Sequence, residues 1–92
     1  MLNTPVTKLR KAAPGSLTAA ELAAYFKRKR YPRTRTAITA FELGVTQSAP
    51  ERFLELYAEA VGQPVEVVTE AHHRTVRMRE RRSGPFAAQR VA

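Results

Sequence analysis

The sequence predicts an all-α protein: a compact bundle of about five short helices with a basic C-terminal extension. Apolar residues recur at helical spacing in several segments, and these segments begin at capping residues and end at glycine or proline. The chain has 92 residues, 43% of them hydrophobic, which suits one small folded domain. We expect that domain over 1–73 and the extension over 74–92.

The first two predicted helices begin at capping residues. Pro5 begins a short helix, because proline is favoured in a first turn, and the helix ends before Gly15. A second helix is expected over 18–30, because Thr18 and Glu21 form a capping box. Its apolar stripe consists of three residues: Leu22, Ala23 and Phe26.

A third short helix is predicted over 35–43, with Thr34 as N-cap and Gly44 as its stop. Ile38 and Phe41 lie on one face of this helix. The pattern is that of a helix for the DNA major groove, and also that of an ordinary amphipathic helix with a solvated face. The polar face carries Arg35, Thr36, Thr39 and Ala40.

The fourth helix is predicted to begin at a second capping box, formed by Ser48 and Glu51, and to end at Gly62. Its buried stripe is expected to be Phe53, Leu54, Tyr57 and Val61.

A fifth helix is expected from Pro64 to about His72, with Val65 and Val68 facing inward. Residues 75–79 alternate in a way that predicts either a strand or an extension of that helix. The Ser-Gly-Pro sequence at 83–85 predicts a break, followed by a loose tail over 86–92.

The net charge of +8 and a pI near 10.9 are typical of proteins that bind polyanions. The positive charge lies in two blocks on either side of an acidic segment, 51–70, which predicts a folded body with one polyanion-facing side. The first block is Lys27, Arg28, Lys29, Arg30, Arg33 and Arg35, and the second is Arg74, Arg77, Arg79, Arg81 and Arg82.

Other classes of function find little support in the sequence. The chain has no cysteine, which excludes disulfides and cysteine zinc sites. His72 and His73 are adjacent and cannot easily share a metal, so we expect surface or hinge residues and neither metal nor cofactor. With no phosphate loop or nucleophile elbow, an enzyme is not expected. No segment suits a membrane span or a signal peptide, so no membrane partner and a cytoplasmic location are expected.

Three segments together resemble the Cro/phage-repressor (Xre-like) helix-turn-helix family. They are LTAAELA at 17–23, TAITAFELG at 36–44 and APERFLELYAEAVG at 49–62. The resemblance covers roughly residues 6–70. It implies a bundle of about five helices, of which the second and third form the DNA-binding unit, with 35–43 as the recognition helix.

In this resemblance Arg35, Thr36, Thr39 and Ala40 are the residues expected to face bases, and Arg35 is the best reader because its guanidinium can bind guanine through two hydrogen bonds. Ile38 matches the buried anchor and Glu42 an acidic position near the helix end. The chain departs from the family at Ala19, where glutamine is frequent, and over 26–34, which is longer than the family's turn. Expected phosphate contacts are Lys27, Arg28, Lys29, Arg30, Arg33, Thr34, Gln47, Ser48 and Arg52.

We therefore expect a sequence-specific regulator of transcription that binds double-stranded DNA, a repressor acting as a homodimer in a bacterium or a phage-infected cell. Val76 and Met78, or the last helix, are the expected dimer contact. One alternative is an interaction protein, such as an antitoxin or a phage factor, that binds a protein through 51–80 and DNA only non-specifically. Another is a binder of single strands or RNA that stacks bases on Tyr25 and Tyr31.

Overall fold

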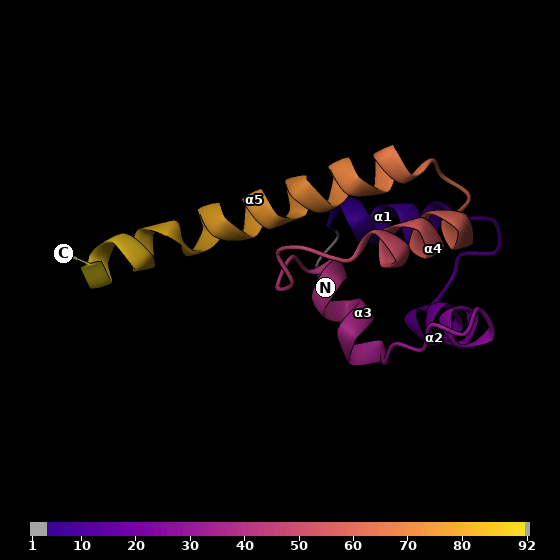
Figure 1. Cartoon of the computed structure of the whole chain (residues 1–92). Coiled ribbons are helices and arrows are strands. Elements are labelled where there is room, and N and C mark those ends of the chain that lie inside the picture. The colour runs from indigo at the N-terminus through magenta and orange to yellow at the C-terminus, as the bar shows by residue number, and fades with distance from the viewer. Residues whose placement is uncertain (1–3, 92) are drawn as a thin grey trace.

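Five α-helices joined by short connections make up the computed structural model, which describes the backbone of residues 4–91 and the side chains of residues 4–81 (Figure 1). The predicted all-α bundle is confirmed, and residues 75–79 are helical and not a strand. The helices are α1 (Pro5–Ala12), α2 (Ala19–Arg28), α3 (Arg35–Glu42), α4 (Glu51–Val61) and α5 (Val65–Val91).

Three of the helices begin where a threonine hydroxyl accepts a hydrogen bond from a backbone amide of the first turn. Thr4 and Thr18 form capping boxes with the residues three positions later, and Thr34 accepts from the amide of Ala37 at 3.1 Å. Each such cap stabilises its helix by about 1 kcal/mol. The predicted caps of α2 and α3 are therefore confirmed.

The capping box predicted for α4 is wrong. The N-cap of α4 is Pro50, which makes no side-chain capping bond, so Ser48 lies outside the helix. A proline disfavours helical angles in the residue before it, and Ala49 accordingly lies outside the helix, which begins at Glu51. The predicted end at Gly62 is confirmed by its left-handed φ of 72°.

The core is built around a chain of aromatic rings from α2, α3 and α4. The ring centroid of Phe41 lies 4.8 Å from that of Phe53 and 5.2 Å from that of Tyr57, and Phe26 lies 4.9 Å from Phe53. The predicted stripe of α4 needs one correction, because Leu56 is fully buried whereas Leu54 is only half-buried. The core face of α4 is thus rotated by part of a turn toward Leu56.

The fifth helix extends well beyond its predicted end near His72. It continues through the predicted break at 83–85 and through the expected tail as far as Val91, and Ala92 lies outside the described residues. Glutamate, alanine, methionine and arginine, all good helix formers, dominate the segment before the break, and a proline removes one backbone hydrogen bond without always ending a helix. Beyond Thr75, α5 leaves the bundle and projects past α3, which gives the molecule extents of 48 × 24 × 23 Å (Figure 1).

Candidate nucleic-acid interface

Helix α3 has one buried face and one open face. Ile38 and Phe41 are buried, as predicted, and so is Glu42. On the other face the side chains of Arg35, Thr36 and Thr39 are exposed and make no hydrogen bond or ion pair with any other residue of the described chain. An open depression of about 600 Å³ runs along this face, and its lining is Arg35, Thr36, Thr39, Ala40 and Leu43.

A buried polar cluster fixes the C-terminal end of α3. Arg10 of α1 binds the carboxylate of Glu42 through Nε at 2.6 Å, and the Tyr57 hydroxyl of α4 donates to the same oxygen at 2.6 Å. Burial, together with the charge of Glu42, raises the pKa of Tyr57 far above its usual value, so Tyr57 stays a proton donor. The Thr4 hydroxyl also donates to the backbone oxygen of Glu42 at 2.6 Å. Three side chains, two from α1 and its N-cap and one from α4, thus hold α3 through one residue.

The sequence analysis matched Glu42 to a family position without recognising that it is buried. The available signal was its spacing: four residues after Ile38, Glu42 must lie on the core face of the helix. A buried carboxylate needs a partner, and Arg10 supplies it from α1.

Helix α5 supplies a second support for α3. The His72 ring stacks on the Phe41 ring with 4.3 Å between the ring centroids, and its Nε2–H donates a hydrogen bond to the backbone oxygen of Thr46 at 2.8 Å. Burial lowers the pKa of His72. The expectation of a surface or hinge residue is therefore wrong for His72, because the continuing helix places it on the same face as Val68 and Thr75. His73 is exposed, as expected.

The connection between α2 and α3, residues 29–34, is basic and well ordered by backbone bonds. Arg30 has a left-handed φ of 59°, and the amide of Tyr31 donates to the backbone oxygen of Phe26 at 3.0 Å, an ending usually made with glycine. Arg33 lies over the Tyr31 ring at 3.9 Å. Among the predicted phosphate-binding side chains at the end of α2 and in this connection, Lys27, Arg28, Lys29, Arg30 and Thr34 are exposed and Arg33 is half-buried.

Lys29 differs from the rest of the block because it is directed toward α4. Its Nζ lies 2.9 Å from a carboxylate oxygen of Glu59, which also accepts a hydrogen bond from the Tyr25 hydroxyl. The hydrogen bonds from Tyr25 and Lys29 lower the pKa of Glu59, and the bond to Glu59 raises the pKa of Lys29. Lys29 therefore already has a carboxylate partner within the chain. Tyr25 lies beneath Arg28 and Lys29, so its ring is not an open stacking surface.

The remaining predicted residues lie around α3 and on α5. The Thr34 hydroxyl caps α3, Gln47 and Ser48 are exposed in the connection to α4, and Arg52 lies exposed 3.6 Å from Glu55. On α5, Val76 is half-buried and Met78 is 41% exposed. Within residues 4–91 no helix combines the length and apolar character that crossing a bilayer requires.

Comparison with known proteins finds no matching family model, and no curated protein and no solved structure with significant similarity to this chain.

Proposed function

We propose that the protein is a sequence-specific regulator of transcription that binds double-stranded DNA with α3 in the major groove. The observation that supports this most is the open face of α3, whose polar side chains are left uncovered by the other helices. The major groove is wide enough to admit one α-helix. The buried face of the same helix is anchored at Phe41 and Glu42, so the open face is presented rigidly.

The charges around α3 suit a polyanionic partner. Lys27, Arg28 and Arg30 are exposed at the end of α2 and in the connection that leads into α3. Such side chains neutralise phosphates and release counterions, which gives affinity without sequence preference. The side chains of α3 supply the preference: Arg35 by two hydrogen bonds to guanine, Thr36 and Thr39 by a hydroxyl bond or by methyl contact with thymine.

Selection of bound sequences from a random duplex library tests the proposal. The protein should enrich one motif, and a palindromic motif would indicate that two copies bind together. Thr39→Glu places a carboxylate on the open face of α3 and should abolish the enrichment. The matched control, Gln63→Glu, adds the same charge in the connection between α4 and α5 and should leave the motif unchanged. Enrichment of no motif by the folded protein would contradict the proposal and favour a protein partner.

A further inference from the structure

We propose that α5 beyond Thr75 is a second DNA-contacting element, an arm that neutralises backbone phosphates beside the site of α3. The arm is defined here as residues 76–91. This inference rests on the proposed function and adds a second surface to it, one that binds the duplex without reading its sequence.

In space, the arm begins beside the C-terminal end of α3. Thr75 is the last buried residue of the described side chains of α5, and the side chains of 77–81 are exposed. Figure 1 shows α5 leaving the bundle beside the C-terminal end of α3 and continuing without any other helix against it. Sixteen helical residues span about 24 Å, which corresponds to about seven phosphates along one strand.

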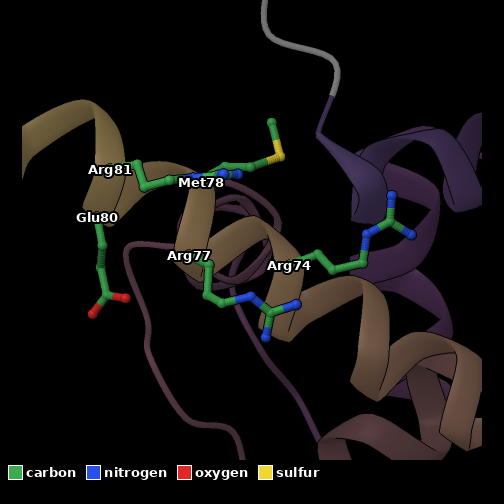
Figure 2. A pocket seen from close by; sticks show the side chains of 5 residues that line it. All are labelled: Arg74, Arg77, Met78, Glu80 and Arg81. Carbon is green, nitrogen blue, oxygen red and sulfur yellow. The ribbon is translucent and has the colours of Figure 1, made fainter.

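The side chains at the base of the arm are cationic and have few partners. Arg74, Arg79 and Arg81 form no ion pair within the described chain, and Arg77 lies 3.7 Å from the exposed Glu70. Figure 2 shows Arg74, Arg77 and Glu80 extending from successive turns of the helix, with Arg77 between the other two. An open depression of about 810 Å³ lies among these side chains, lined by Arg74, Arg77, Met78, Glu80 and Arg81.

The spacing of these arginines explains why an anion is the partner that suits them. Residues 74, 77 and 81 follow one another at three and four positions, so like charges are neighbours on one face. Each such pair destabilises an isolated helix by a few tenths of a kcal/mol. A row of phosphates removes this repulsion, whereas a second copy of the same arginine face would increase it.

The arm is also joined rigidly to α3. Gly44, just after α3, has a φ of 79°, and a Cβ added there would lie 3.0 Å from the backbone oxygen of Thr75. Together with the His72 stack on Phe41, this close contact fixes the base of the arm against the end of α3. A duplex bound by α3 therefore meets an arm whose base is already held beside the end of that helix.

The test compares two double variants that each lose two positive charges. Arg77→Gln with Arg81→Gln changes the arm, and Lys8→Gln with Lys11→Gln changes exposed positions of α1. The probes are a duplex with the motif enriched from the random library and a scrambled duplex. The readouts are the slope of log affinity against log salt concentration and the backbone protected from hydroxyl-radical cleavage. Helix content by circular dichroism verifies that both variants are folded.

The arm variant should make the salt slope shallower by about 0.9 for each lost phosphate contact, so by up to about 1.8, and should lose backbone protection at one edge of the footprint. The α1 variant should match the parent in both readouts. An arm variant with the parent's slope and footprint overturns the arm and leaves the role of α3 standing. Sedimentation velocity is a third readout: an arm variant that changes the sedimentation coefficient but not the slope also overturns the arm, in favour of an interface between copies.

A failure of the proposed function can be distinguished from a failure of the arm. If no motif is enriched and the arm variant still flattens the slope on random duplex, the sequence-specific role of α3 is wrong and the arm stands as a phosphate-binding element. If the folded parent binds no duplex, both are wrong.

Discussion

Glu42 is a carboxylate buried in an aromatic core, where Arg10 and Tyr57 are its partners. Glu42→Ala should lower the free energy of unfolding by about 3 kcal/mol, because it leaves the half-buried Arg10 charge without a partner. Tyr57→Phe should cost only about 1–2 kcal/mol, since Arg10 still pairs with Glu42. Urea unfolding measures both. The control is Glu55→Ala at an exposed position, which should change the free energy of unfolding by less than about 0.5 kcal/mol. Equal losses for Glu42→Ala and Glu55→Ala would contradict a stabilising role of the buried cluster.

His72 makes stability depend on pH. Burial lowers its pKa in the folded state, so the folded protein takes up a proton less readily than the unfolded chain does. Its contribution is complete above the unfolded histidine pKa of about 6.5 and is lost as the pH falls from there through the lower folded pKa. Melting temperatures across this window should fall less steeply for His72→Gln than for the parent, whereas the exposed His73→Gln should follow the parent.

Substitution of Arg35 distinguishes recognition of bases from neutralisation of phosphate charge. Arg35→Ala should cost about 1–3 kcal/mol on the enriched motif and relax the preference at one base pair per half-site, while binding to scrambled duplex weakens only slightly. Arg28→Ala, which removes the same charge from the end of α2, should weaken both duplexes alike. Titration of each variant at one salt concentration gives its affinities for the enriched motif and for the scrambled duplex. If Arg35→Ala lowers both affinities by the same factor, Arg35 only contacts phosphate.

At the scale of the element, the joint between α3 and α5 depends on a glycine. Gly44 and Gly62 both have left-handed φ angles, of 79° and 72°, but only at Gly44 would an added Cβ meet other atoms within 4 Å. Gly62→Ala should therefore cost about 1 kcal/mol for the backbone alone, and Gly44→Ala at least about 2 kcal/mol. Equal costs in urea unfolding would mean that Thr75 moves away without penalty.

The elements that were predictable from sequence are those whose causes are local. The caps at Thr18 and Thr34 and the stop at Gly62 depend on neighbours within one turn, and each was found. The capping box predicted at Ser48 does not form although its sequence pattern is complete. Pro50 disfavours helical angles in the residue before it, so the helix begins after Ser48. Local signals also compete, and the sequence pattern alone does not rank them.

The partners of Glu42 and His72 could not be predicted, because they come from segments distant in the chain. Arg10 is 32 positions from Glu42, and Thr46 is 26 positions from His72. Periodicity shows that a face is buried but not which other face it meets. The length of α5 was missed for the opposite reason: the described side chains from 77 to 81 are exposed, so no apolar stripe marks the helix there. The exposure of Arg35, Thr36 and Thr39 was predictable because an amphipathic pattern marks both faces of α3.

At the scale of the whole molecule, stability should be unevenly distributed between bundle and arm. Amide hydrogen exchange should be slow for the residues of α5 up to Thr75, which pack on the bundle, and much faster over 77–81, whose side chains are exposed. Addition of duplex should slow exchange in the arm if its arginines contact phosphate. Uniform protection along α5 in the absence of DNA would show that the arm is held by other contacts.

The open face of α3 contributes to no hydrogen bond or ion pair within the described chain, and the caps and the core of the helix lie on its other sides. Substitutions at Arg35, Thr36 and Thr39 therefore leave the fold nearly unchanged while they alter what the helix can recognise. Under the proposed function, a lineage could acquire a new target sequence through these positions one mutation at a time, with every intermediate still folded. The same freedom makes these three positions the natural ones to randomise in a search for variants with a chosen specificity.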